Sequence, residues 1–273
     1  FFTGNSGTTI WWLGHHFSYP VHTGAVSAIY FSERLYEFPQ GLIGLAVATA
    51  IYPLLSAHCA RQNKKAFGED LTLGLRIVLV FAIPAGVGLM LFSDNLVHLL
   101  FQRGEFSAND TARTADMVFG FSTGVWAFCA QPVLVRAFYV LGDIKTPFRI
   151  GLSCCLLNVL ICIVFLWKFK EQGLAVSASV SAGIQAVLLF LFFAVKHGFI
   201  DYKAIIISVL RACAATVLMA LAVEFVFELI PGNNSLADIV HIFLGGIVAL
   251  FIFFTVYRFL GGREPGVFRP SSF

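Results

Sequence analysis

Long apolar runs dominate the pattern of hydrophobic and polar positions along this chain. Most runs reach about 20 residues, which is the length that a helix needs to cross the hydrocarbon core of a bilayer. Short polar segments containing Gly, Pro, Asn or Asp separate them, so they read as distinct helices. The pattern predicts seven membrane-spanning helices, at residues 24–57, 71–92, 114–140, 147–167, 173–195, 204–230 and 237–260.

The first run is too long for one straight crossing. Its residues 24–57 would extend about 51 Å at 1.5 Å per residue. We therefore expect this helix to be tilted, to extend beyond the membrane, or to be broken near Pro39 and Gly41. At the start of the fourth helix, Thr146 is expected to be the N-cap and Pro147 the first helical residue.

Composition supports a polytopic membrane protein and excludes several other classes. Hydrophobic residues make up 58% of the chain and charged residues only 12%, with a mean hydropathy of +0.84. Soluble domains carry about 25% charged residues. The net charge of +3 is spread between apolar runs, so no nucleic-acid partner is expected. The six cysteines have no zinc-site spacing, and no metal, cofactor or disulfide framework is expected.

Charge placement predicts the orientation of the helices. Residues 1–23 are polar, Gly-rich and aromatic, and we interpret them as an outer loop of a chain whose upstream sequence is missing. If the first helix runs inward, 13 Lys and Arg residues lie on the inner side and 4 on the outer side, with Arg34 set apart. Because inner loops are enriched in Lys and Arg, the C-terminus is predicted to be cytoplasmic.

The most informative chemistry lies in the outer half of the first helix, where Glu33, Arg34 and Glu37 interrupt an apolar context. A charged side chain inside a membrane costs several kcal/mol and is a functional-site hypothesis by default. Ser27 lies seven residues before Arg34 and Glu37 three after it, so the three share a helical face. One interpretation is an anion site in a water-filled cavity, because Arg binds phosphate bidentately. The alternative is an ion-paired cluster at the outer interface.

Two other polar segments have simpler interpretations. Residues 100–111 form a short polar stretch in which Ser107 or Asp110 could cap the next helix, and a plain outer loop is favoured over a re-entrant element. Arg136 closes a helix at the inner surface, where an arginine anchor is favoured over a binding role. No nucleophile–base pair, metal-ligand pair or phosphate-cradling Gly loop is recognisable, so catalysis is not expected.

Three motifs together resemble the MurJ (MviN) lipid II flippase family. The resemblance extends over residues 24 to about 262, with the motifs in the same order and spacing. The motifs are Gly24-Ala-Val-Ser27 with Ser32-Glu-Arg-Leu-Tyr-Glu-Phe-Pro39 and Gly44-Leu-Ala-Val-Ala-Thr-Ala50, then Leu100-Phe-Gln-Arg-Gly-Glu-Phe106, then Arg136-Ala-Phe-Tyr-Val-Leu-Gly-Asp-Ile-Lys-Thr-Pro147.

The resemblance implies an all-α fold of the multidrug/oligosaccharidyl-lipid/polysaccharide exporter type, with fourteen helices in two lobes. The seven helices here would form the C-terminal lobe. The implied division is an outer, periplasmic-side loop at 1–23, transport helices at 24–200, two extra helices forming a lipid-tail groove at 201–262, and a cytoplasmic tail at 263–273. The implied partners are lipid II, membrane lipids and the missing N-terminal lobe, and the implied location is the bacterial cytoplasmic (inner) membrane.

By the same resemblance, Arg34 matches a cavity arginine that engages the lipid II diphosphate, with Ser27 and Glu37 at neighbouring cavity positions. The expected function is flipping of lipid II from the inner to the outer leaflet by alternating access. The alternative within the superfamily is export of another undecaprenyl-linked oligosaccharide or of a drug. A polytopic lipid-processing enzyme is the third possibility, and it predicts clusters of Asp, His or Glu at one membrane face, which the sequence lacks.

Overall fold

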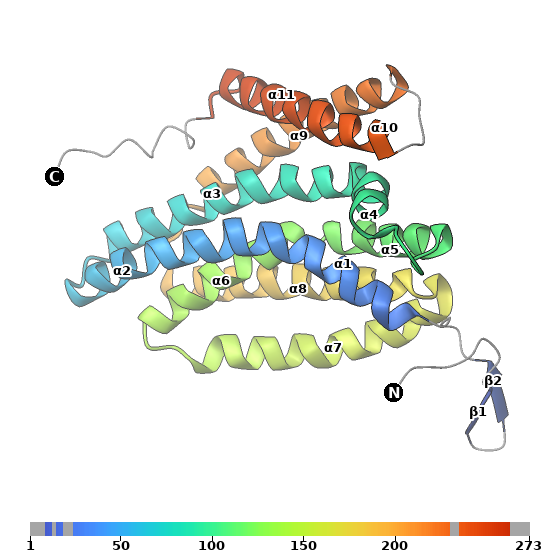
Figure 1. Ribbon diagram of the computed structural model, residues 1–273. Helices are drawn as coiled ribbons and strands as arrows, with labels where there is room; N and C mark the ends of the chain where they lie inside the picture. The colour runs from blue at the N-terminus through green and yellow to red at the C-terminus, as the bar shows by residue number, and fades with distance from the viewer. Residues whose placement is uncertain (1–8, 13–14, 19–23, 230–234, 263–273) are drawn as a thin grey trace.

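The chain folds into a bundle of long helices in a computed structural model that describes residues 9–12, 15–18, 24–229 and 235–262 (Figure 1). Among the described residues, six helices are long and apolar enough to cross a membrane, or seven if one bent pair counts as a single span. Each of the seven predicted ranges overlaps one of these spans. The chain elements that form them are α1 (Ala25–Pro39), η1 (Gln40–Leu45), α2 (Ala46–Ala60), α3 (Lys64–Leu91), α5 (Ala108–Ser122), α6 (Val125–Val140), α7 (Lys145–Phe169), α8 (Gln172–His197), α9 (Tyr202–Leu229), α10 (Ser235–Val240), η2 (His241–Gly245) and α11 (Gly246–Phe259).

The first span is one continuous helix of 36 residues with a π-helical segment in the middle. The segment η1 begins directly after Pro39, where a break was one of the three expectations from the sequence. Proline lacks an N–H and disturbs the regular hydrogen-bond ladder, and π-helical turns, although rare, occur mostly as short segments inside α-helices. The helix therefore changes its winding at this point without ending.

The third span is bent by 45° between α5 and α6, which the sequence did not predict. Gly124 lies at the bend, and a Cβ there would stand 2.7 Å from Ser179 Oγ. This glycine therefore lets α8 approach the bend closely. Ser179 Oγ also donates to the backbone carbonyl of Gly120 at 2.9 Å, so the hydroxyl satisfies a backbone group near the bend.

Two apolar cores meet along α3. One contains buried side chains of α2, α3, α6 and α8, including Leu71, Val133 and Leu189. The other contains side chains of α3, α9 and α11, including Val80 and Phe253. Figure 1 shows α3 between the α1–α2 helix and the α9–α11 pair, with α7 on the opposite side of the bundle packed against α8.

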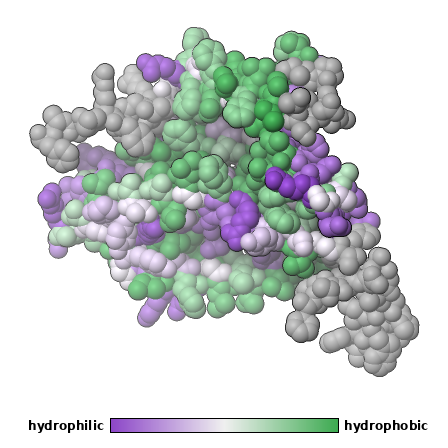
Figure 2. All heavy atoms as spheres, viewed as in Figure 1, coloured by the Kyte–Doolittle hydropathy of each residue, from purple (hydrophilic) through white to green (hydrophobic). Residues whose placement is uncertain are grey.

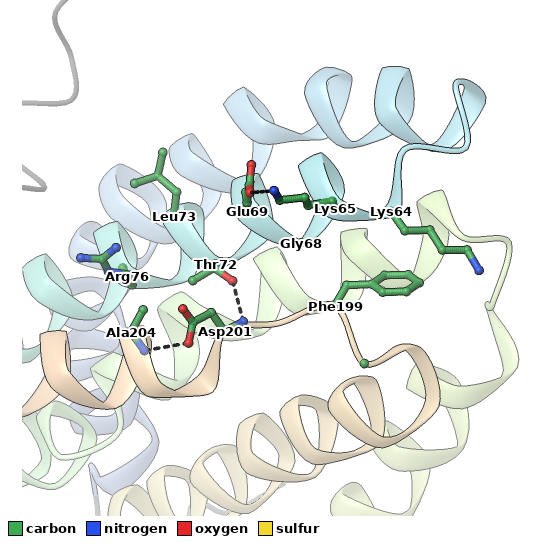
Figure 3. A pocket seen from close by; sticks show the side chains of 11 residues that line it. Lys64, Lys65, Gly68, Glu69, Thr72, Leu73, Arg76, Phe199, Asp201 and Ala204 are labelled. Atoms are coloured by element: carbon green, nitrogen blue, oxygen red, sulfur yellow. Dashed lines mark hydrogen bonds and ion pairs between the residues drawn. The ribbon is translucent and has the colours of Figure 1, made fainter.

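A tight backbone contact joins α3 to the segment between α8 and α9 (Figure 3). A Cβ at Gly68 would stand only 1.9 Å from the carbonyl oxygen of Phe199, so this position requires glycine. The backbone N–H of Asp201 donates to Thr72 Oγ1 at 3.1 Å, and Asp201 Oδ1 accepts from the N–H of Ala204 at 3.1 Å. These contacts fix the start of α9 against the N-terminal part of α3.

One helix cap agrees with the expectation from the sequence, and another differs from it. Ser107 and Asp110 form a capping box at the start of α5, as their spacing suggested, after the short helix α4 (Ser93–Phe101). Thr146, however, is not the N-cap of α7, which begins at Lys145. Asp143 Oδ1 accepts from the N–H of Thr146 at 3.1 Å, so the carboxylate takes the capping role that the sequence gave to the threonine.

The N-terminal region, which is expected to be an outer loop, contains a two-stranded antiparallel hairpin. Its strands are β1 (Thr9–Trp12) and β2 (His15–Ser18), with Thr9 opposite Ser18. The rest of residues 1–23 and the tail at 263–273 lie outside the described residues.

Candidate functional site

Arg34 lies on the exposed face of α1. Its Nη1 contacts Glu37 Oε2 at 2.8 Å, and its guanidinium lies 4.9 Å from the ring centroid of Tyr30. The Arg34 and Glu37 side chains are 57% and 46% exposed. Ser27 lies two turns earlier on the same exposed face. The structure therefore brings Arg34 and Glu37 together, and Ser27 lies on the same exposed face.

The opposite face of α1 explains why the polar face points outward. Ala25, Ala28 and Ser32 are buried, and Ala28 packs with Met117 and Phe121 of α5. Ser32 Oγ donates to the Ile29 carbonyl, which satisfies the hydroxyl locally. The small side chains allow α5 to approach α1, so the longer polar side chains are turned away from the bundle.

The π-helical segment is held against α6 by a close backbone contact. A Cβ at Gly44 would stand 2.7 Å from Cys129 Cα, and Cys129 Sγ lies 3.7 Å from the carbonyl oxygen of Pro39. The wide turns use one more residue than an α-helix does over the same rotation. The 15-residue separation between Arg34 and Thr49 corresponds to about four turns of helix, and both side chains are exposed.

Arg136 of α6 reaches this same face. Its Nη1 donates to Thr49 Oγ1 at 2.7 Å, and Thr49 Oγ1 donates in turn to the Leu45 carbonyl at 2.7 Å. The sequence analysis favoured an arginine anchor at the inner surface and did not connect Arg136 with Arg34. Spacing along one helix carries no signal for a contact between α2 and α6.

An apolar groove of about 540 Å³ runs along the other side of α2. It lies between the α2 side chains of Ala46, Ala50 and Leu54 and the α3 side chains of Ile77 and Phe81. The Phe81 ring also lies 6.1 Å from the ring of Phe254, so α11 reaches the same region of α3. The helix η1–α2 thus separates a polar face toward α6 from an apolar groove toward α3. Figure 2 shows hydrophilic surface interrupting the hydrophobic surface in the middle of the viewed face.

A second cavity, of about 580 Å³, opens beside the start of α3 (Figure 3). Lys64, Lys65 and Arg76 line it, but much of their charge is engaged nearby. Lys65 Nζ lies 4.0 Å from Glu69, Arg76 Nε donates to Ser208 at 2.8 Å, and the Lys64 ammonium lies over the Phe199 ring. We interpret these contacts as the junction between α3 and the α8–α9 segment.

A buried polar cluster connects α10 and η2 to α4. Asp238 accepts a hydrogen bond from Asn95 Nδ2 at 2.7 Å and contacts His98, while Asn95 also lies 3.3 Å from His241. Buried polar groups need such partners. Within the described part of the chain, no group of three or more His, Cys, Asp or Glu side chains is arranged to hold a metal ion.

The fold and the site define a class: a polytopic helical membrane protein with one arginine on an exposed face of its first span and a second arginine that reaches this face from α6. The sequence profile of the family described as lipid II flippase MurJ matches residues 12–245. That range is well over half of the chain. The chain therefore belongs to the lipid II flippase MurJ family.

Individual relatives agree with this assignment. The chain is 36% identical to a probable lipid II flippase MurJ of Vibrio cholerae over 170 residues, which cover 62% of this chain and 32% of the relative. It is 30% identical to the probable lipid II flippase MurJ of Buchnera aphidicola subsp. Schizaphis graminum over 251 residues, covering 90% of this chain and 49% of the relative.

A solved structure has the same fold. It is described as lipid II flippase MurJ in an inward closed conformation, and it matches with a TM-score of 0.71 at 24% identity. The match covers 87% of this chain and 48% of the solved chain. The chain thus spans about half the length, or less, of the relatives that it matches.

Proposed function

We propose that the complete protein containing this chain is a transporter that flips lipid II from the inner to the outer leaflet of the bacterial cytoplasmic membrane. It does so by alternating access, for cell-wall synthesis, and not by covalent catalysis. Membership of the MurJ family and the names of the relatives support this proposal. In it, the present chain supplies the C-terminal lobe of a fourteen-helix exporter, with residues 1–23 periplasmic and the C-terminus cytoplasmic.

The observation that carries the proposal is Arg34 on the exposed face of a membrane-spanning helix. A cation facing lipid tails would cost several kcal/mol, so an aqueous cavity is the favourable environment. The partner Glu37 is about half exposed, and exposed ion pairs contribute only about 0–1 kcal/mol. A diphosphate can therefore replace Glu37 as the partner of the Arg34 guanidinium, or it can bind the guanidinium together with Glu37. Ser27 would add a neutral hydrogen bond two turns outward.

The two sides of α2 suit the two parts of an amphiphile. We infer that the charged headgroup follows the polar face, while the prenyl tail lies in the apolar groove beside α3. The helices of residues 201–262 lie next to this groove through the contact of Phe81 with Phe254. This arrangement supports a role for that helical pair in holding the tail.

The decisive test replaces Arg34 in the complete protein. Arg34→Ala should abolish lipid II translocation, measured as the appearance of labelled lipid II at the outer leaflet of spheroplasts or proteoliposomes. Arg34→Lys should retain part of the activity, because Lys keeps the charge but loses the bidentate geometry. Arg149→Ala is the matched control, since Arg149 is an exposed arginine on a different helix, α7.

Normal translocation by Arg34→Ala would overturn the assignment of this site. Loss of activity with a different undecaprenyl-linked oligosaccharide but not with lipid II would instead identify another cargo of the same superfamily.

A further inference from the structure

We propose that Arg136 and Thr49 form a second anion-binding subsite on the face that carries Arg34, nearer the end of the lobe assigned to the cytoplasm. The subsite would take a phosphate or carboxylate group of the cargo. This inference rests on the proposed transport function and extends it to residues outside the α1 motif.

The direction of the Arg136 side chain is the first argument. α6 ends at Val140, whose carbonyl oxygen accepts from Cys59 Sγ at 3.4 Å, so the ends of α2 and α6 lie at one level. Thr49 lies ten residues before Cys59, or about 15 Å deeper along α2. An arginine near a helix end normally extends toward the headgroups. Arg136 extends instead toward the middle of the span.

The surroundings of this pair are the second argument. Thr49 is exposed on the surface of the lobe, and Arg136 is half-buried. A guanidinium directed toward the middle of a span and facing lipid would be costly, as at Arg34. Water on this face removes that cost. The Arg136–Thr49 pair therefore indicates that the aqueous path extends inward past η1, along the polar side of α2.

The hydrogen-bonding capacity of Arg136 is the third argument. A guanidinium has five N–H donors in a planar fork, and the bond to Thr49 uses one of them. Among the described residues no carboxylate forms an ion pair with Arg136, whereas Glu37 partly neutralises Arg34. Arg136 thus retains donors and a full charge for an incoming anion, with Thr49 holding the guanidinium in position.

The separation of the two arginines suggests their order of use. Arg34 and Thr49 are about 20 Å apart along the helix axis. An anionic headgroup entering from the cytoplasmic side would meet Arg136 first and Arg34 in the outer half of the span. Arg136 would then act in capture of the cargo, and Arg34 in its passage outward.

The first experiment measures lipid II binding and translocation by variants of the complete protein. Arg136→Ala should weaken lipid II binding about tenfold, as expected for loss of a charge-assisted bond, and Arg136→Lys should restore part of it. Thr49→Val should have a smaller effect. Arg149→Ala is again the control, and thermal stability of each variant separates binding defects from misfolding.

The second experiment does not depend on transport. A cysteine at position 49, in a protein whose native cysteines are replaced, should react rapidly with a membrane-impermeant charged thiol reagent, and lipid II should slow that reaction. The control keeps only Cys213, which is exposed on α9 between the apolar side chains of Leu210 and Val217, and it should not react.

Each outcome has one meaning. If Thr49→Cys stays unreactive, or if Arg136→Ala binds lipid II as Arg149→Ala does, the second subsite is wrong while the Arg34 site stands. If Arg34→Ala also translocates lipid II normally, the Arg34 site is wrong as well, whereas the proposed function fails only if the unaltered complete protein does not translocate lipid II.

Discussion

Gly68 is the position where a single added methyl group should disturb the lobe most clearly. A Cβ there would stand 1.9 Å from the carbonyl oxygen of Phe199 and 2.8 Å from its carbonyl carbon, where ordinary contacts begin at 3.4 Å. The chain between α8 and α9 must therefore retreat by about 1.5 Å in Gly68→Ala. The atoms that clash are backbone, so no side-chain rotation relieves the contact.

The expected loss of folding stability in Gly68→Ala follows from the contacts that this displacement of the backbone disturbs. Overpacking of this kind costs about 1–3 kcal/mol. The hydrogen bond from Asp201 N–H to Thr72 Oγ1 would also lengthen, at about 1 kcal/mol. The better helix propensity of alanine returns about 1 kcal/mol. We expect a net destabilisation of about 1–3 kcal/mol.

A matched control lies in the same helix. Gly88 of α3 has no atom within 4 Å of an added Cβ, so Gly88→Ala should be neutral or stabilising. The assay is the fraction of detergent-purified complete protein that stays monodisperse after heating, with the midpoint temperature compared among variants. If Gly68→Ala melts at the same temperature as Gly88→Ala, the close backbone contact does not exist as described.

Two further predictions concern other contacts of the lobe. Gly44→Ala should lower the melting temperature, because its Cβ would stand 2.7 Å from Cys129 Cα, whereas Gly41→Ala, with no atom within 4 Å, should not; equal midpoints would contradict this packing. The hydrogen bond from Lys196 lowers the pKa of the Asp143 carboxyl to about 2, below its unfolded value of about 4. The stability that this pair contributes is therefore complete above pH 4 and is lost as the pH falls through 2. Asp143→Asn should lower the free energy of unfolding by at most about 1 kcal/mol at pH 7. Acidification to pH 2 should cause no further loss through this pair in the variant, and melting curves at both pH values would check this.

The sequence predicted the spans well because the bilayer imposes a simple rule. A crossing helix needs about 20 apolar residues and must satisfy its backbone groups internally, so each span leaves a long continuous signal. The face that carries Ser27, Arg34 and Glu37 was predictable for a related reason, since spacings of three, four and seven residues fix which side chains share a helical face.

The features that the sequence analysis missed all depend on contacts between helices. The bend at Gly124 requires the close approach of Ser179, and neither residue alone signals it. The helix start near Thr146 offered two oxygen acceptors within four residues, and the geometry of the turn selected Asp143. The direction of Arg136 is set by Thr49, a partner 87 positions away in the sequence. The spacing of apolar and polar residues along the chain carries no signal for these contacts.

The π-helical segment brings the first span close to α6. In an uninterrupted α-helix, a separation of 15 residues would rotate Thr49 about 60° away from Arg34. The extra residue in η1 corresponds to about 100°, so the offset becomes about 40° in the opposite direction, and both side chains are exposed. Gly44 lets the wide turns rest directly on the backbone of α6 at Cys129. That same contact brings α6 close enough for Arg136 to reach Thr49. The close contact at Gly44 therefore helps to place the second arginine on the exposed face of the first span, while the apolar groove lies on the other side of α2.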